Sequence, residues 1–294
     1  MAASIIDGRR LASEIRTTLR ERTSHLAESG TIPHLKAVRV GDDAASGMFT
    51  RSQDRACRKE GILFSEEILP AGVNTGKVVE CLERLNKDPQ VSGIILVKPM
   101  GSDVDFACLR FTISPSKDVE GINSQTAVSS GTSVHRFHPC TAEAAMELAL
   151  STGFDFHGSH VVVVGGSETV GVPVALLALA RWATITVCHI YTKDLANHTR
   201  QADCLFVAAG SPGLITADMV KPGAVVIDIG INRVEEKTPD GMSRTVTVGD
   251  VDFEPVSAVA GFLTPVPGGV GPMTVAVLLR NVVTAAEREF RSKG

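Results

Sequence analysis

The sequence predicts an α/β protein of two domains with parallel, doubly wound sheets. Helices with apolar periodicity alternate with short apolar strands along most of the chain. This alternation weakens between about residues 102 and 140 and then restarts. A chain of 294 residues with 44% hydrophobic content can also fill two cores. Helices that separate consecutive buried strands indicate parallel pairing.

The first half of the chain begins with a helix and a strand. Leu11, Ile15 and Leu19 recur at four-residue spacing after Asp7, which predicts an amphipathic helix. The other expected elements of this half are a strand over 34–40, a helix over 44–59, a strand over about 62–69, a helix over about 75–86 and a buried strand over 93–97.

The second half repeats the pattern after a helix that opens at Pro139-Cys140-Thr141. We expect strands over 160–164, 184–189, 204–209 and 224–229, in a Rossmann-type sheet. The predicted domains are residues 1–145, completed by a C-terminal helix over about 273–294, and residues 146–272. The segment 231–251 is rich in charge and turn residues, which predicts a solvated hairpin without chemistry.

Composition argues against several classes of partner. A net charge of −4 gives no electrostatic reason to bind nucleic acid or an anionic membrane, and no window approaches the ~20 apolar residues of a membrane span. Six scattered cysteines without a C-x-x-C pair indicate thiols in a reducing compartment, so we expect a cytoplasmic protein. His135 and His138 lie near Cys140 but lack a second ligand pair, so no metal site is predicted.

A glycine turn follows the four valines of 161–164. It reads Gly165-Gly166-Ser167-Glu168-Thr169-Val170-Gly171 and leads into a helix, which is where a dinucleotide pyrophosphate binds. Glu168 stands where the fingerprint has its middle glycine, so a purely structural turn is the alternative. The next strand ends at Cys188-His189-Ile190, with neither an acidic residue nor an arginine to choose between NAD and NADP.

The segment Leu263–Thr274 contains three prolines and three glycines, which no regular element accommodates well. We expect a shaped loop that leads into the apolar-periodic helix beginning near Val275. Such a loop can hold a ligand, and the alternative is a rigid connector.

Together these segments resemble the bifunctional methylenetetrahydrofolate dehydrogenase/methenyltetrahydrofolate cyclohydrolase family over essentially the whole chain. The resemblance implies a homodimer that binds a tetrahydrofolate derivative and NADP or NAD. It also implies hydride transfer from the methylene bridge to the nicotinamide, followed by hydrolysis of the methenyl product to 10-formyltetrahydrofolate. The most specific matches are 117–121, 139–141, 165–173, 227–232, 248–251 and 265–274.

The resemblance also exposes departures on the helix over 44–59. The family pattern Ser-x-x-Tyr-x-x-x-Lys, on one helix face, is read here as Ser46, Phe49 and Gln53. The tyrosine hydroxyl and the lysine amine are therefore absent. Because hydrolysis needs a proton-handling group there and hydride transfer does not, we expect dehydrogenase activity with doubtful cyclohydrolase activity.

A further departure lies in the strand over 93–99, where the family has a glutamine that contacts its lysine. Without gaps, Val97 replaces that glutamine and Lys98 points to the opposite strand face. If the strand slips by one residue, Lys98 takes that place and forms an exchanged pair with Gln53. The alternative is an ordinary strand-end lysine with its ammonium in water.

The resemblance transfers site roles to matching positions. Glu120 replaces an aspartate that binds the pterin ring. A repurposed one-carbon transferase and a non-catalytic folate-binding paralogue are the alternative functions. The expected residues are Gln53 and Lys98 for catalysis; Ser46, Phe49, Val97, Glu120, Pro265, Gly268, Gly269, Pro272 and Thr274 for the folate; and Thr141, Gly165, Gly166, Ser167, Val170, Gly171, His189, Ala209, Gly210 and Ile231 for the cofactor.

Overall fold

The computed structural model describes residues 2–123, 137–237 and 243–293, and the elements below refer to these residues. The chain forms two compact units. The six-stranded unit comprises residues 1–12 and 141–274, and the three-stranded unit comprises residues 13–140 and 275–294. The first twelve residues thus group with the later part of the chain, because β1 (Ser4–Ile5) pairs with β11 (Phe262–Leu263).

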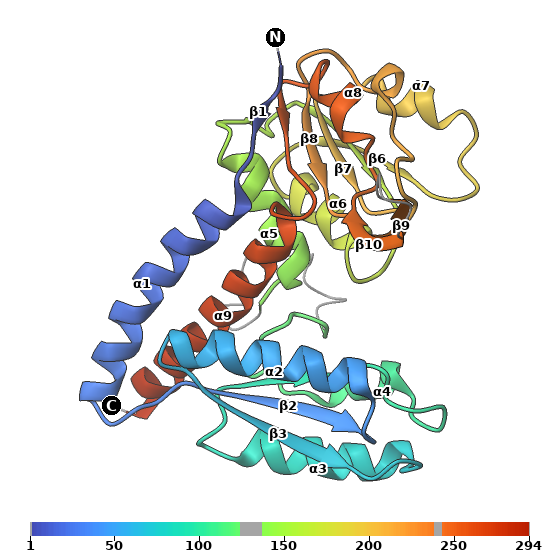
Figure 1. Ribbon diagram of the computed structural model, residues 1–294. Helices are drawn as coiled ribbons and strands as arrows, with labels where there is room; N and C mark the ends of the chain where they lie inside the picture. The colour runs from blue at the N-terminus through green and yellow to red at the C-terminus, as the bar shows by residue number, and fades with distance from the viewer. Residues whose placement is uncertain (1, 124–136, 238–242, 294) are drawn as a thin grey trace. The chain divides into compact units, whose positions relative to one another are not determined.

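The three-stranded unit has a parallel sheet of order β3-β2-β4, formed by Leu63–Leu69, His34–Val40 and Gly93–Leu96. Helix α2 (Ala44–Lys59) covers one face of the sheet and α3 (Thr75–Lys87) lies on the other face (Figure 1). Helix α4 (Phe106–Thr112) packs beside α3. Most of α1 (Gly8–Glu28) and of α9 (Val270–Lys293) also belongs to this unit.

One face of this sheet is a continuous apolar core. Ile94 and Leu96 of β4 pack with Val38 and Val40 of β2 against α3 and α4. Because side chains alternate along a strand, Ile95 and Val97 face the side of α2. Val97 is 3% exposed and its N–H donates to Val38 O, so β4 keeps its direction to this point.

The six-stranded unit has the strand order β1-β11-β8-β7-β5-β6, with parallel pairing throughout. Strand β5 (His160–Val164) lies between β6 (Thr184–Cys188) and β7 (Cys204–Val207), and β8 (Val225–Asp228) follows β7. The chain therefore reverses direction across the sheet at β5, which confirms the expected doubly wound Rossmann-type sheet. The remaining elements here are α5 (Cys140–Leu150), α6 (Gly171–Leu179), α7 (Leu195–Thr199), the 3-10 helix η1 (Ala217–Met219) and α8 (Phe253–Ser257).

The segment after β8 forms the expected hairpin. Strand β9 (Asn232–Lys237) pairs antiparallel with β10 (Ser243–Val248), and the tip between them lies outside the described residues. Polar residues predominate in both strands, and the β10 side chains keep partial or full exposure to solvent. The hairpin itself is therefore a solvated ribbon, while its two ends return to the six-stranded sheet.

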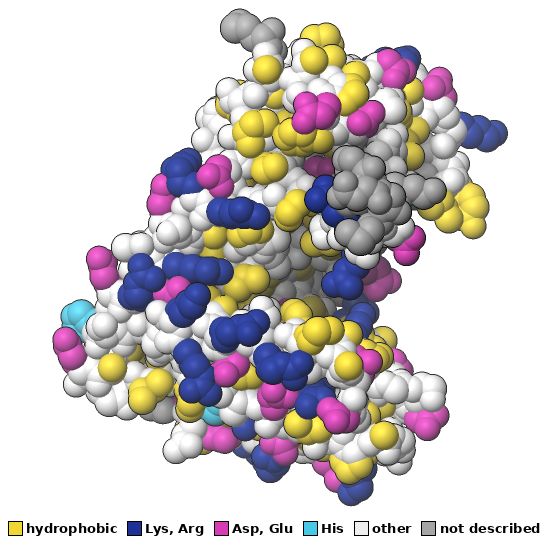
Figure 2. Space-filling view, viewed as in Figure 1, with side chains coloured by type: hydrophobic (Ala, Val, Ile, Leu, Met, Phe, Trp, Pro, Cys, Tyr) yellow, Lys and Arg dark blue, Asp and Glu magenta, His cyan; other side chains and the backbone are white. Residues whose placement is uncertain are grey.

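The surface is mixed in charge. Figure 2 shows Lys and Arg side chains over α2, where Arg51, Arg55, Arg58 and Lys59 are exposed. This is the solvated face of an amphipathic helix, since its buried residues include Ser46, Gln53 and Cys57 on the opposite side. Among the described residues, the structure contains no helix with the length and apolarity to cross a membrane.

The proline- and glycine-rich segment is shorter than expected. Helix α9 already begins at Val270, so the irregular loop covers only 264–269. The expectation that helix begins near Val275 is wrong, because Pro272 lies in the first helical turn, where its missing N–H is not needed.

Candidate functional site

The reversal point of the six-stranded sheet brings two turns together at the carboxyl ends of β5 and β7. Ala208 N donates to Val164 O at 2.7 Å, and Gly165 N donates to Cys188 O at 2.8 Å. Gly165 has φ +117°, and a Cβ there would overlap the Ala208 carbonyl oxygen. In open α/β sheets, ligands bind in this crevice.

The glycine turn is closely packed against backbone at Gly165 and Gly171 and has free space at Gly166. A Cβ at Gly171 would overlap the Gly165 carbonyl oxygen, whereas a Cβ at Gly166 would meet only His189 Cβ at 3.7 Å. Ser167 O accepts a hydrogen bond from Val172 N, and Ser167 Oγ accepts one from Gly171 N. Val170, at the N-cap of α6, makes no side-chain capping bond. The turn therefore presents exposed backbone at a helix N-terminus, which fits a dinucleotide pyrophosphate.

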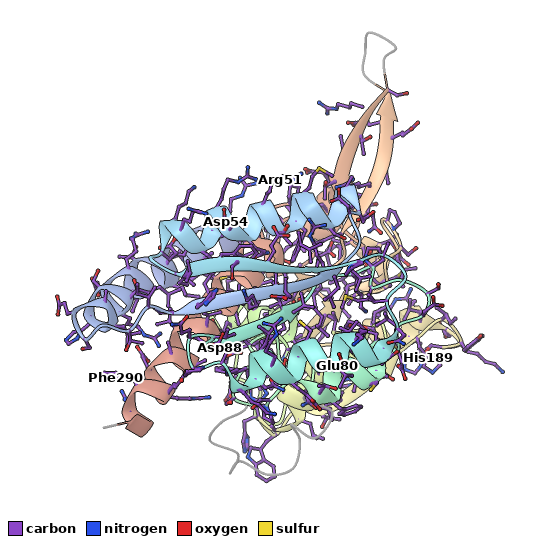
Figure 3. The ribbon with its side chains drawn as sticks, turned by 90° about the horizontal axis from the view of Figure 1, so that it is seen from below. Arg51, Asp54, Glu80, Asp88, His189 and Phe290 are labelled. Carbon is purple, nitrogen blue, oxygen red and sulfur yellow. The ribbon has the colours of Figure 1, made fainter. Side chains whose placement is uncertain are left out.

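The end of β6 forms the neighbouring edge of this region. His189 is exposed; its N–H donates to Thr192 Oγ1 at 2.8 Å, and its Nδ1 accepts from Tyr191 N at 3.2 Å. Figure 3 labels His189 on the six-stranded unit. Ala209 and Gly210 follow β7 beside the glycine turn, Ile231 is 68% exposed just before β9, and Thr141 lies in the first turn of α5.

Two buried carboxylates organise the adjoining turns, and the sequence reasoning gave them no role. Asp250 accepts backbone hydrogen bonds from the turn after β7, and Asp228 accepts Gly230 N, Asp250 N and Val251 N. Burial raises the pKa of Asp228 to about 6, against the lowering effect of these backbone donors. Asp250 lies at the carboxyl end of the segment 231–251, which was expected to carry no chemistry, and its contacts are hydrogen bonds to the backbone of the neighbouring turn.

On the three-stranded unit, Ser46 joins the start of α2 to the end of β4. Asp43 caps α2, since its Oδ1 accepts Ser46 N at 2.8 Å and Ser46 Oγ at 2.9 Å. Ser46 Oγ also lies 3.0 Å from Lys98 O, within donating distance. Hydrogen bonds from Ser46 lower the pKa of the exposed Asp43 carboxyl. These contacts place the backbone of Lys98 beside the first turn of α2.

Gln53 carries a buried oxygen on α2 that lacks a hydrogen-bond partner. Its side chain is 5% exposed, and its Oε1 accepts no hydrogen bond from any described residue. Arg51 and Asp54, labelled on α2 in Figure 3, point away from the sheet on the solvent side. Phe49 is 43% exposed, so the expected face is only partly buried. A buried carboxamide oxygen loses its hydrogen bonds to water, and here no protein donor replaces them. This oxygen is therefore suited to accept a hydrogen bond from a ligand.

Lys98 does not form the exchanged pair with Gln53. Its Nζ lies 3.9 Å from the centroid of the Phe106 ring on α4, a cation–π contact. Phe106 packs against the α3 and α4 face of the sheet, whereas Val97 faces α2. In this structure the Lys98 ammonium therefore contacts α4, and Gln53 Oε1 receives no hydrogen bond from it.

Glu120 lies in a segment with two carboxylates. The Glu120 residue is half-buried, and burial together with the charge of Asp118 raises the pKa of its carboxyl to about 7. A backbone hydrogen bond with Leu96 and the charge of Lys98 act in the opposite direction. Burial also raises the pKa of Asp118 to about 6, although its oxygens accept Ile122 N and Asn123 N. Glu120 is therefore poised to change protonation near neutral pH.

Helix α9 supports the same segment. Asn281 Nδ2 donates to Val119 O at 2.9 Å, and Cys140 Sγ donates to the same oxygen at 3.3 Å. A Cβ at Gly121 would overlap the His138 carbonyl carbon and oxygen. The backbone on both sides of Glu120 is thereby held in place by residues distant in sequence.

The loop over 264–269 is built by close backbone packing within the six-stranded unit. Gly269 N donates to Pro265 O at 2.8 Å, and a Cβ at Gly8 would overlap the Gly269 carbonyl oxygen. Gly268 has φ +125° and lies against Arg9. Pro272 and Thr274 belong to the first turns of α9, where Thr274 Oγ1 donates to Val270 O.

The prediction that His135, His138 and Cys140 form no metal site includes His135, which lies outside the described residues. Across 2–123, 137–237 and 243–293, no group of three or more His, Cys, Asp or Glu side chains is arranged to hold a metal ion.

Comparison with known proteins matches two family models along the chain. Residues 6–120 match the model of the tetrahydrofolate dehydrogenase/cyclohydrolase catalytic domain, and residues 139–290 match that of its NAD(P)-binding domain. A "Bifunctional protein FolD" of Moorella thermoacetica is 44% identical over 288 residues, covering 98% of this chain and 100% of the relative. One from Azoarcus is 42% identical and covers 100% of both chains.

Solved structures of relatives have the same fold. The bifunctional FolD enzyme of Campylobacter jejuni superposes with a TM-score of 0.89 at 38% identity, covering 98% of this chain and 99% of the other. The methylenetetrahydrofolate dehydrogenase-cyclohydrolase of Trypanosoma brucei, solved with NADP and an inhibitor, gives 0.88 at 33% identity and covers 99% of both chains. The open glycine turn at the sheet reversal and these full-length matches lead to one conclusion: the chain belongs to the tetrahydrofolate dehydrogenase/cyclohydrolase family.

Proposed function

We propose that this protein oxidises 5,10-methylenetetrahydrofolate to 5,10-methenyltetrahydrofolate with NAD(P), and that it hydrolyses the methenyl product poorly. In the first reaction, the methylene carbon gives up a hydride and becomes the methenyl cation. NAD(P) supplies the acceptor of that hydride. In the second reaction, water adds to the methenyl carbon and the ring opens to 10-formyltetrahydrofolate with release of a proton.

The dehydrogenase step needs orientation more than acid–base chemistry from the protein. Gly166 and Ser167 would hold the pyrophosphate of the cofactor through exposed backbone at the α6 N-terminus, and Gly165 and Gly171 would shape the turn through close packing. Thr141, Val170, His189, Ala209, Gly210 and Ile231 are proposed as further cofactor contacts.

The folate side is proposed to use the α2–β4 residues and Glu120. Glu120 would pair with donors of the pterin ring, and its pKa of about 7 makes this pairing sensitive to pH. Ser46 fixes the end of β4, and Phe49 and Val97 supply apolar contact. Pro265, Gly268, Gly269, Pro272 and Thr274 are proposed as further folate contacts.

The proposal of weak hydrolysis rests on one observation, the presence of glutamine at position 53. Its buried amide cannot give up or take a proton near neutral pH, and Phe49 beside it has no hydroxyl. The amine of Lys98 lies over the Phe106 ring and makes no hydrogen bond to Gln53 Oε1. General acid–base catalysis contributes about 10²- to 10⁴-fold, so its loss affects hydrolysis far more than hydride transfer.

The two alternative functions have less support. Relatives that are 42 to 44% identical over nearly the whole chain are named bifunctional, which favours the family's reactions over a one-carbon transferase or a non-catalytic paralogue. We further propose a homodimer in the cytoplasm. The edge strand β6 and the apolar Trp182, 77% exposed, and Leu179, 52% exposed, are suited to contact a second copy. Sedimentation of Trp182→Asp against wild type tests this assignment.

A spectrophotometric assay tests the catalytic proposal. With methylenetetrahydrofolate and either NAD⁺ or NADP⁺, we expect reduced nucleotide and methenyl product to form together. Methenyl decay should then be close to the rate without enzyme. Absence of reduced nucleotide with both cofactors would refute the dehydrogenase, and fast enzyme-dependent decay would refute the assignment of weak hydrolysis.

A further inference from the structure

The turn that follows β7 is held by one buried carboxylate. Asp250 Oδ2 accepts Ala209 N at 2.7 Å and Gly210 N at 2.8 Å, and its Oδ1 accepts Ser211 N at 2.9 Å. Asp250 is 0% exposed. Three consecutive backbone N–H groups around one anion form the kind of concave site that often receives a phosphate group. Here the protein's own carboxylate occupies it, so the turn is shaped before any ligand arrives.

A second layer fixes the position of that carboxylate. Asn232 Nδ2 donates to Asp250 Oδ1 at 2.7 Å, and Asp250 N donates to Asp228 Oδ1 at 3.1 Å. A Cβ at Gly230 would overlap the Asp250 carboxylate, and one at Gly249 would overlap Asp228 Oδ2. Glycine at both positions therefore permits the two acids to approach the backbone closely.

The held turn adjoins the glycine turn of the cofactor region. A Cβ at Gly165 would overlap the carbonyl oxygen of Ala208, the residue before the turn, and Ala208 N bonds to Val164 O at the end of β5. Both turns stand at the carboxyl edge of the sheet where it reverses. Residues 209–211 thus lie between Asp250 and the proposed dinucleotide site, and the Asp250 oxygens are bonded to protein groups.

We propose that Asp250 is a positioning residue for the nicotinamide cofactor, presetting residues 209–211 in the conformation that binds it. This inference rests on the proposed NAD(P) site. Asp250→Asn keeps the size of the side chain but turns an NH₂ group toward backbone N–H donors that need an acceptor. The turn then opens locally, while the strand pairing of the sheet is unchanged.

The matched control is Asp203→Asn, at the other end of β7. Asp203 accepts His160 N at 2.8 Å and Lys221 Nζ at 2.6 Å, so it also ties backbone in the same sheet, but at the amino edge. A milder second variant is Asn232→Ala, which removes one donor to Asp250 and leaves its charge in place. Thermal unfolding of all three proteins shows that each is folded before binding is measured.

The experiment measures calorimetric binding of NADPH and NADH, together with amide hydrogen exchange of residues 209–211 without nucleotide. We expect Asp250→Asn to raise the Kd of the preferred nucleotide at least 10-fold and to accelerate exchange at these amides. Asn232→Ala should raise this Kd two- to threefold, and Asp203→Asn should change neither the Kd nor the exchange of these amides. Wild-type-like Kd and exchange in Asp250→Asn would overturn the inference alone, as would an equal rise in Kd in Asp203→Asn. Failure of the wild type to bind either nucleotide would instead overturn the proposed function, and the inference with it.

Discussion

The glycine turn region of the six-stranded unit and the α2 face of the three-stranded unit differ in how completely their polar groups are bonded. Around Gly165 and Asp250, backbone donors and buried carboxylates meet in closely packed, mutually bonded turns. On α2, Gln53 is buried with an unpartnered oxygen, and Phe49 is 43% exposed.

This difference separates the two activities of the family. The region that binds the cofactor depends on backbone shape, which small residues and internal carboxylates preserve. On the α2 face, Phe49 and Gln53 carry neither a hydroxyl nor an amine, so the proposed weak hydrolysis depends on individual side chains. One reaction can therefore persist while the other declines.

The largest effect is expected from Gly171→Ala. Its Cβ would overlap the Gly165 carbonyl oxygen, which is backbone and cannot move aside. We expect a loss of about 3 kcal/mol in unfolding free energy and a marked loss of nucleotide affinity, because overpacking forces the turn apart. Urea unfolding and calorimetry with NADPH measure both, with Gly76→Ala in α3 as the control in ordinary contact. Wild-type stability in Gly171→Ala would contradict the packing argument.

Restoring an amine on α2 should give the next largest effect. Gln53→Lys places an ammonium where the Gln53 oxygen has no partner, and we expect enzyme-dependent methenyl decay to rise about 10-fold or more. Dehydrogenase activity should change far less. Ser52→Lys, on the exposed side of the same helix, controls for added charge. If both variants accelerate decay equally, the position of the amine is not what limits hydrolysis.

A smaller effect is expected from Ser46→Ala, which detaches the end of β4 from α2. Loss of the Ser46 hydroxyl leaves the Lys98 carbonyl without this donor and should cost about 1 kcal/mol of unfolding free energy. The KM for the folate should rise with little change in kcat, since the residue positions the strand end. Exposed Ser52→Ala is the control, and equal effects of the two variants would remove Ser46 from the site.

The last expected effect is a change in the pH dependence of stability at Glu120. Its folded pKa of about 7 exceeds the ordinary value of 4.5, so between these values the folded state binds more protons. Unfolding free energy then falls as pH rises through about 7. Glu120→Gln should be less sensitive to pH between 4.5 and about 7 in urea titrations, whereas Glu80→Gln on the exposed side of α3 should match wild type. Identical slopes in Glu120→Gln and wild type would show that this carboxyl does not titrate there.

Much of the fold followed from periodicity. Helix α2 and strands β2 and β5 begin and end where the pattern of apolar residues predicts, because that pattern records which side of each element is buried. The start of α9 was placed too late, since prolines and glycines that suggest a loop are also tolerated in a first helical turn.

The sequence by itself determined the order of the elements, the glycine turn and the absence of a hydroxyl at Phe49 and of an amine at Gln53, because each depends on local spacing or residue identity. Only the tertiary structure decided that Lys98 lies over Phe106 and that Asp250 holds the turn after β7. The partners of Asp250 in that turn are 39 to 41 residues away in the chain. Such contacts arise when parallel strands align their carboxyl ends, which spacing along the sequence does not encode.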